Sequence, residues 1–259
     1  MAETIAVAVN RPIWVDLASS DPVAAQQFYG KLFGWNVEVS PDPQYGGYGV
    51  AKIDGKDVAG IGGKMMPEAP TAWSVYIGSN DADAVVALVQ AAGGAVIAPP
   101  MAVGDQGRMA VFTDPAGAFI SIWQPETMMG FISGVPGTFA WAELNARGLE
   151  RAVPFYRAVF GWEPHVSPMG DEPGAPMYTE FHLGEKSIGG GTEINPMVPA
   201  DVPSYWLAYF STEDVDATQR KAIELGATEL LAPRDFAGGR FGVLSDPEGA
   251  VFGLLKFAR

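Results

Sequence analysis

The sequence contains no cysteine and only two histidines, His165 and His182. The absence of cysteine excludes disulfides, thiolate catalysis and cysteine-ligated zinc or iron–sulfur sites. Basic residues are also few, because 16 Lys and Arg stand against 30 Asp and Glu, for a formal net charge of −14. An acidic surface repels phosphate backbones and anionic lipid headgroups, so we expect neither nucleic acid nor a membrane as a partner.

Long apolar runs are missing as well. No run reaches 18 apolar residues, so the sequence predicts no membrane-spanning helix. Residues 1–10 lack a basic segment followed by a long apolar stretch, so we expect no signal peptide and a cytoplasmic location. Apolar residues make up 48% of the chain and charged residues 18%, a composition that favours a well-packed core over disorder.

The sequence repeats itself over nearly its whole length. Residues 14–35 align without a gap with residues 141–162, and the match includes an FY pair and an FGW end in both copies. Residues 107–118 align in the same way with residues 239–250. Self-similarity on this scale indicates a duplicated architecture. A stretch with two prolines and three glycines, residues 125–137, separates the copies and is typical of a linker.

Within each copy, the pattern of apolar residues and turn signals predicts strand, helix and three strands, twice over. In the first copy, Ser20, Asp21 and Pro22 predict a helix start and Gly34 its end. A second helix is expected over residues 81–92. We therefore predict an α+β fold with two tandem domains, each with two β-α-β-β-β modules that form a curled sheet around a cleft. The predicted boundaries are 1–125 for domain 1, 126–137 for the linker and 138–259 for domain 2.

Three features together resemble the vicinal oxygen chelate superfamily, the glyoxalase, bleomycin-resistance and dioxygenase type. They are the FYxxxFGW ends at 28–35 and 155–162, the DPxG turns at 114–117 and 246–249, and the four-fold modular spacing. The close duplication is most similar to tandem actinobacterial glyoxalase-like proteins. This resemblance implies paired modules around a cleft. In the enzymes it implies a divalent metal, with His or Gln ligands on the first strand of a module and Glu on the last.

The residues at those implied ligand positions are not metal ligands. The first-strand positions hold tryptophan, and the last-strand positions hold a serine and a glycine: Trp14, Trp73, Trp141, Trp206, Ser121 and Gly253. A shift of two residues keeps the strand face and brings in Asp16 and Glu143, together with Val75 and Ala208. Two carboxylates in different domains do not make a site, because a facial triad needs two histidines and a carboxylate. We therefore expect no metal and no cofactor.

The tryptophans have two interpretations. They can pack in the core, since strands favour aromatic residues. They can instead line the clefts, where indole rings suit a flat apolar or cationic ligand. We favour the second. The predicted ligand-binding set comprises Trp14, Asp16, Trp73, Ser121, Trp141, Glu143, His182 and Trp206.

Asp16 and Glu143 follow a tryptophan by two residues and share its strand face. If that face lines a cleft, each carboxylate pairs with a ligand amine or serves as an acid or base, which makes the two residues the catalytic candidates. The alternative is a carboxylate held by nearby backbone or by an arginine. For His165 and His182 we expect a structural or cleft-lining role, and for Arg108 and Arg240 structural salt bridges in preference to anion binding.

Three functions stay open at this point. The first, which we favour, is a metal-independent protein that binds a small molecule, an aromatic metabolite or antibiotic, as a resistance or biosynthetic accessory. The second is an enzyme, either a glyoxalase-like lyase or a metal-free isomerase or tailoring enzyme that uses Asp16 or Glu143. The third is an interaction protein with vestigial clefts. Either a monomer or a homodimer is compatible with the duplication.

Overall fold

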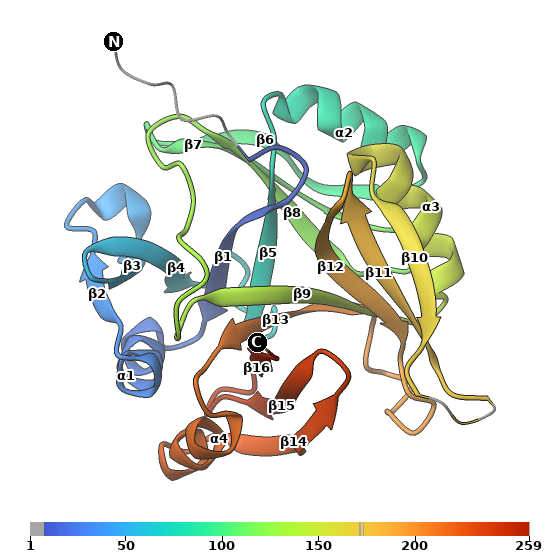
Figure 1. Ribbon diagram of the computed structural model, residues 1–259. Helices are drawn as coiled ribbons and strands as arrows, with labels where there is room; N and C mark the ends of the chain where they lie inside the picture. Colours follow the sequence, from blue (N-terminus) through green and yellow to red (C-terminus); the bar gives the residue numbers. More distant parts are fainter. Residues whose placement is uncertain (1–7, 171, 173, 259) are drawn as a thin grey trace. The chain divides into compact units, whose positions relative to one another are not determined.

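A computed structural model describes residues 8–170, 172 and 174–258, so most of the N-terminal segment 1–10 lies outside the described residues. Four β-α-β-β-β modules follow one another along the chain, each with one long helix (Figure 1). The elements of the first half are β1 (Pro12–Ser19), α1 (Pro22–Phe33), β2 (Asn36–Val39), the 3-10 turn η1 (Pro43–Tyr45), β3 (Gly49–Ile53), β4 (Lys56–Gly63), β5 (Ala72–Gly78), α2 (Ala82–Ala91), β6 (Ala95–Val103), β7 (Gly107–Thr113) and β8 (Phe119–Pro125).

The second half repeats this order. Its elements are β9 (Phe139–Ala146), α3 (Leu149–Phe160), β10 (Glu163–Pro168), β11 (Met177–Leu183), β12 (Lys186–Glu193), β13 (Tyr205–Ser211), α4 (Val215–Glu224), β14 (Thr228–Phe236), β15 (Gly239–Ser245) and β16 (Val251–Phe257). Each half forms one eight-stranded mixed sheet, in the orders β2-β3-β4-β1-β5-β8-β7-β6 and β10-β11-β12-β9-β13-β16-β15-β14. The predicted α+β fold with tandem modules is confirmed. No helix of the described residues is long and apolar enough to cross a bilayer.

The compact units of the molecule do not coincide with the two halves of the sequence. Unit 1 combines residues 8–14, 75–130 and 142–206, and unit 2 combines residues 15–74, 131–141 and 207–258. Each unit therefore takes one module from each half of the chain. The predicted linker lies between the two sheets in the sequence. The chain passes from unit 1 to unit 2 inside this linker, after residue 130, and returns to unit 1 at residue 142.

Local sequence explains where the first helix begins and ends. Asp21 caps α1 by accepting a hydrogen bond from the Ala24 N–H, and Pro22 occupies the first turn. Gly34 then ends the helix in the left-handed region at φ 75°, a conformation that costs other residues a steric penalty. The matching helix α3 starts at Gly148 without a side-chain cap of its own, so the Glu193 carboxylate accepts from the Gly148 and Leu149 N–H groups instead.

A buried hydrogen-bond relay lies at the centre of unit 2 and joins the two halves of the chain. The Trp73 Nε1–H donates to the Tyr29 hydroxyl at 2.9 Å, and this hydroxyl donates to the Asp246 carboxylate at 3.0 Å. The same carboxylate accepts the N–H groups of Glu248 and Ala250 and thereby closes the DPEG turn. Burial and the nearby Asp246 raise the pKa of the Tyr29 phenol well above its usual value, so the hydroxyl keeps its proton.

Unit 1 contains the same relay. The Trp206 Nε1–H donates to the Tyr156 hydroxyl at 2.8 Å, which donates to Asp114 at 2.8 Å. Asp114 closes the DPAG turn through the Ala116 and Ala118 N–H groups. The FY motif and the DPxG motif, which are far apart in the sequence, are thus two ends of one interaction. We conclude that the repeated motifs encode the pairing of modules within each unit.

Candidate functional site

The four strand tryptophans do not share one face, contrary to expectation. Trp73 and Trp206 lie on the helix side of their strands, are 6% exposed, and are held in the relays by Tyr29 and Tyr156. These contacts support the core-packing interpretation for both indoles. Trp14 and Trp141 instead lie on the strand face that carries Asp16 and Glu143, because they precede these residues by two.

We call the face of each module opposite its helix the open face. On the open face of the first module, in unit 2, residues of four neighbouring strands form a row in register: Glu38 opposite Val50, Val50 opposite Gly60, and Gly60 opposite Asp16. Residues in register point to the same side of a sheet. The predicted site residue Asp16 therefore lies at one end of a row that contains a position without a side chain.

Tyr48 occupies the space that this glycine leaves. A Cβ on Gly60 would overlap the Tyr48 hydroxyl, and a Cβ on Gly62 would lie 2.6 Å from Tyr48 Cδ2. The ring thus lies across both glycines and brings its hydroxyl to Asp16, to which it donates at 3.2 Å. Asp16 and Tyr48 are both half-buried. The two glycines therefore make room for the tyrosine ring.

The open face of the third module, in unit 1, has the equivalent row. His165 is opposite Glu180, Glu180 is opposite Gly190, and Gly190 is opposite Glu143. Tyr178 covers Gly190, where an added Cβ would lie 2.6 Å from Tyr178 Cε1. The row differs from that of unit 2 because it carries three ionisable side chains beside the tyrosine.

Other polar groups surround Glu143. The Asn145 side-chain amide donates to the Glu143 carboxylate at 3.3 Å. Burial, and secondarily the negative charge of Glu143, raise the pKa of Tyr205. The Tyr205 hydroxyl thus keeps its proton next to a carboxylate, so this part of the face can both donate and accept hydrogen bonds.

His182, a predicted ligand-binding residue, is part of a small cluster on the outer strands of unit 1. Its ring stacks on His165 with centroids 3.9 Å apart and an interplanar angle of 15°. His182 Nε2 lies 3.3 Å from Glu180 Oε1. The cluster overlaps the row described above, since His165 and Glu180 belong to both.

The last-strand positions are Ser121 and Gly253. Each is in register with a buried tyrosine of the neighbouring parallel strand, Tyr76 and Tyr209. A Cβ on Gly253 would lie 2.6 Å from Tyr209 Cγ and would overlap other ring atoms. The phenol ring therefore occupies the volume that a metal-ligating side chain at this position would need.

The donor set consequently does not fit the divalent metal that the family resemblance implies. Tryptophan nitrogens have no lone pair for a metal and those of Trp73 and Trp206 donate hydrogen bonds, while Ser121 and Gly253 offer no carboxylate. Within the described ranges, no three His, Asp or Glu side chains are grouped so as to hold a metal ion. We derive no chemistry through a metal.

The matched arginines form salt bridges, as predicted. Arg108 contacts Asp83 of α2 at 2.7 Å. Arg240 contacts Asp216 of α4 at 2.6 Å and Asp235 of β14 at 2.9 Å. Both arginines tie a hairpin to the helix of its own module.

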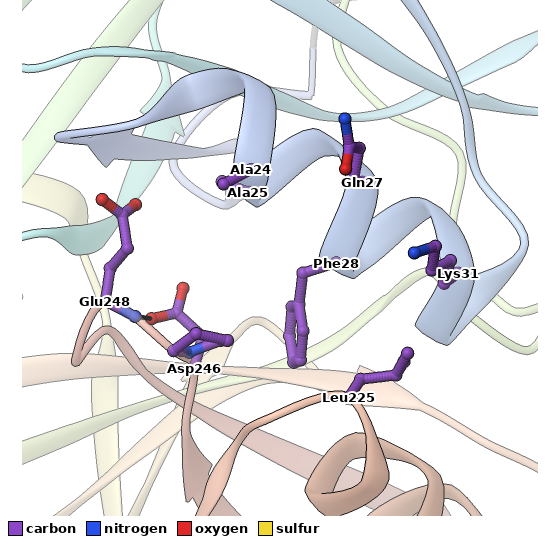
Figure 2. Close-up of a pocket in the computed structure, with 9 residues that line it drawn as sticks. Ala24, Ala25, Gln27, Phe28, Lys31, Leu225, Asp246 and Glu248 are labelled. Carbon is purple, nitrogen blue, oxygen red and sulfur yellow. Dashed lines mark hydrogen bonds between the residues drawn. The ribbon is translucent and has the colours of Figure 1, made fainter.

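A cavity of about 230 Å³ lies on the helix side of unit 2 (Figure 2). Phe28 and Lys31 of α1 line one wall and Asp246 and Glu248 the other. Both carboxylates are engaged: Asp246 in the relay, and Glu248 with the Ser19 hydroxyl and the Asp21 N–H. Ligand pockets measure about 300–1,000 Å³, so this cavity is a poor candidate for one.

Sequence reasoning missed the tyrosines that frame the carboxylates. The signal was present, because Tyr48 aligns with Tyr178 and both copies carry glycines on the following strand. What the sequence did not reveal is that each tyrosine lies over a glycine of the adjacent strand. The open faces thus combine a carboxylate, a phenol hydroxyl and aromatic rings, a combination suited to a polar aromatic molecule.

Comparison with known proteins agrees with this architecture. Residues 11–122 match the family described as Glyoxalase/Bleomycin resistance protein/Dioxygenase superfamily, and residues 141–255 match the Glyoxalase-like domain. The chain is 40% identical over 252 residues to the Mycobacterium tuberculosis protein named "Putative glyoxylase CFP32", covering 95% of this chain and 94% of that one. It is 38% identical over 266 residues to the "Anthracycline biosynthesis protein DnrV" of Streptomyces peucetius, covering 96% and 94%.

Solved structures share the fold at low sequence identity. The Mn(II)-bound glyoxalase from Novosphingobium aromaticivorans superposes with a TM-score of 0.65 at 19% identity, over 96% of this chain and 82% of that one. The 2,3-dioxygenase LapB from Pseudomonas sp. KL28 gives a TM-score of 0.64 at 17% identity, over 96% and 92%.

Proposed function

Because the chain belongs to the glyoxalase/bleomycin resistance protein/dioxygenase superfamily, we propose that it uses this fold to bind an aromatic small molecule without a metal. The observation that carries the proposal is the replacement of ligand positions by aromatic rings, seen most directly where the Tyr209 ring covers Gly253. A face lined by rings binds flat ligands through stacking and apolar burial.

The two carboxylates give the proposed site its polarity. Asp16 and Glu143 each stand at the end of a row beside a tyrosine that covers a glycine. A carboxylate accepts hydrogen bonds from ligand hydroxyl or amine groups, and the phenol of Tyr48 or Tyr178 adds a second polar contact. The relatives named for anthracycline biosynthesis support an accessory role beside a biosynthetic pathway.

The remaining parts of the proposal concern partners and location. The net charge of −14 supports a small-molecule ligand over nucleic acid or an anionic membrane. We place the protein in the cytoplasm, as a monomer or a homodimer.

Metal analysis combined with ligand titration tests the proposal. The purified protein, dialysed against zinc, nickel, manganese and ferrous iron, should retain less than about 0.1 metal per chain, and tryptophan fluorescence should change with members of an aromatic panel. Asp16→Asn and Glu143→Gln should each weaken binding at their own face about tenfold, as expected for a lost charge-assisted hydrogen bond. A metal close to one per chain, or no response to any aromatic, would contradict the proposal.

A second function has a specific observation in its favour. The row of unit 1 places His165, Glu180 and Glu143 on one open face with the Tyr178 hydroxyl between the two carboxylates. Such a set suits metal-free acid–base catalysis, for example an isomerisation. Loss of turnover in Glu143→Gln or Asp16→Asn with ligand binding retained would favour this function, and unchanged turnover in both variants would remove it.

A further inference from the structure

Strands β14–β16 in unit 2 carry a second aromatic surface, which we call the Phe face. In register across the three strands, Arg234 is opposite Phe241, while Phe236 is opposite Gly239 and Gly239 is opposite Phe257. Strands two apart in a sheet are separated by about 10 Å. Gly239 lies between Phe236 and Phe257, where an added Cβ would overlap the Lys256 carbonyl oxygen and lie 2.9 Å from Phe257 Cα, so the glycine permits a close approach of β15 and β16.

The rings of the Phe face make edge-to-face contacts, one within the face and one with a tryptophan of β9. Phe236 and Phe241 lie 5.7 Å apart at 83°, and Phe257 lies 6.2 Å from the Trp141 ring at 77°. Phe236 is nevertheless 42% exposed and Phe257 is 49% exposed. Large aromatic side chains exposed together on an otherwise acidic protein mark a binding surface.

Arg234 gives this surface its charge. The guanidinium carbon lies 5.0 Å from the centroid of the Phe241 ring, a cation–π contact. In the described part of the chain, no carboxylate lies at ion-pair distance from Arg234, whereas Arg240 of the same hairpin contacts two. Stacking leaves the in-plane N–H groups of a guanidinium able to bind a planar anion.

The equivalent positions of the first half are a natural reference. There, Met101 is opposite Met109, Val103 is opposite Gly107, and Gly107 is opposite Pro125. The glycine is retained, but none of the residues paired there is aromatic or cationic. The Trp123 ring lies against Gly107 instead, where an added Cβ would be 2.7 Å from Trp123 Cζ2. The aromatic rings and the arginine thus occur together in the second half only.

We propose that the Phe face binds a planar aromatic molecule that bears a carboxylate or phenolate. The ligand ring packs against the exposed rings of Phe236 and Phe257, and its anionic group accepts hydrogen bonds from the Arg234 guanidinium. This inference rests on the proposed function, because it names the chemical class of the aromatic ligand and the unit that recognises it.

Calorimetric titration of the full chain with 2-naphthoate and its neutral analogue 2-naphthamide tests the inference. We expect naphthoate to bind about tenfold more tightly than naphthamide. Arg234→Met should remove this difference by weakening naphthoate alone, while Phe257→Leu should weaken both probes. Lys256→Met is the matched control, because it also removes one positive charge. Lys256 is opposite Arg240 and lies on the other face of the sheet, so this variant should leave both affinities unchanged.

Three outcomes would overturn the inference. The first is equal affinity for the two probes, and the second is an equal effect of Arg234→Met and Lys256→Met on binding. The third is a wild-type dimer in sedimentation that Phe257→Asp converts to a monomer, because a second copy of the chain would then cover the rings. The same measurements separate this inference from the proposed function.

If naphthoate does not bind but another aromatic molecule binds in a way that depends on Asp16, only this inference is lost. If a metal is found at one per chain, metal independence is lost while the naphthoate result stands.

Discussion

The open faces of the two units start from the same row of strands and differ in what they carry. In unit 2 the row contains Glu38, Val50 and Asp16, and in unit 1 it contains His165, Glu180 and Glu143. The glycine and its covering tyrosine are the same in both rows. Duplication has therefore retained the frame that holds a carboxylate, while the ionisable groups around it have diverged.

The helix sides of the units show the opposite behaviour. Both contain a Trp–Tyr–Asp relay with hydrogen bonds of 2.8–3.0 Å, and in both the tyrosine and the aspartate come from different halves of the chain. The comparison teaches that the packing of modules is symmetric and the chemistry of the faces is not. Five experiments test this contrast.

Separating the halves should have the largest effect. Fragments 1–130 and 131–259 each lack the relay partner that the other provides, so neither should fold as a monomer. Mixed or co-expressed, they should form a one-to-one complex with native-like circular dichroism. A folded, monomeric fragment with a cooperative melting transition would show that the units do not depend on both halves.

Removing a relay carboxylate should destabilise its unit by about 3 kcal/mol, because a buried tyrosine hydroxyl and two backbone N–H groups lose their acceptor. Asp246→Ala and Asp114→Ala should cost similar amounts in urea unfolding if the relays are equivalent. A marked difference between the two variants would show that the symmetry of the helix sides is only geometric.

The same carboxylates set a pH dependence. Burial raises the pKa of Asp246 and of Asp114, so the folded chain retains these protons to a higher pH than the unfolded chain. Their contribution to the free energy of unfolding therefore falls as the pH rises from about 3.8 through the folded pKa. In that pH range, Asp246→Asn should make the slope of the free energy of unfolding against pH less negative. An unchanged slope would show that other groups cause the pH dependence.

Alanine at the glycine of each row should disturb the open face more than the core. Gly60→Ala displaces Tyr48 from Asp16, and Gly190→Ala displaces Tyr178, so each should weaken aromatic binding at its own unit by roughly tenfold. Gly63→Ala is the control, because its Cβ would meet only Pro22 Cγ at 4.0 Å. Equal binding by all three variants would exclude the tyrosines from the site.

The smallest effect is expected for the helix-to-hairpin salt bridges. Hydrogen bonds to Arg240 lower the pKa of Asp216, so this pair stabilises the fold above the unfolded pKa of the carboxyl and the stabilisation is lost as the pH falls. Both side chains remain in contact with solvent, with 32% and 41% of their surface exposed, so Arg240→Met should lower the melting temperature slightly at low salt and not at high salt. A large, salt-independent decrease would assign Arg240 a packing role.

The sequence predicted the fold because its signals are local or repeated. Caps, turn glycines and the 127-residue offset between Trp14 and Trp141 placed the modules. The site was predicted only in part. Asp16 and Glu143 do lie on open faces, but the partner of Trp73 is a tyrosine 44 residues away, and Tyr48 reaches Asp16 only because Gly60 lacks a side chain. Contacts of this kind depend on strand register, which a single sequence does not encode in readable form.

The crossed composition of the units has a consequence for synthesis on the ribosome. The Tyr29 hydroxyl finds its acceptor 217 residues later, near the C-terminus. At about 5–20 residues per second, α1 waits roughly 10–40 seconds before Asp246 has been made. During this interval Phe28 and Tyr29, both buried in the finished protein, are without Phe252, the residue that covers them. The first module thus keeps two aromatic rings without their partner during synthesis, and unit 2 is complete only once residues 246–252 have been made.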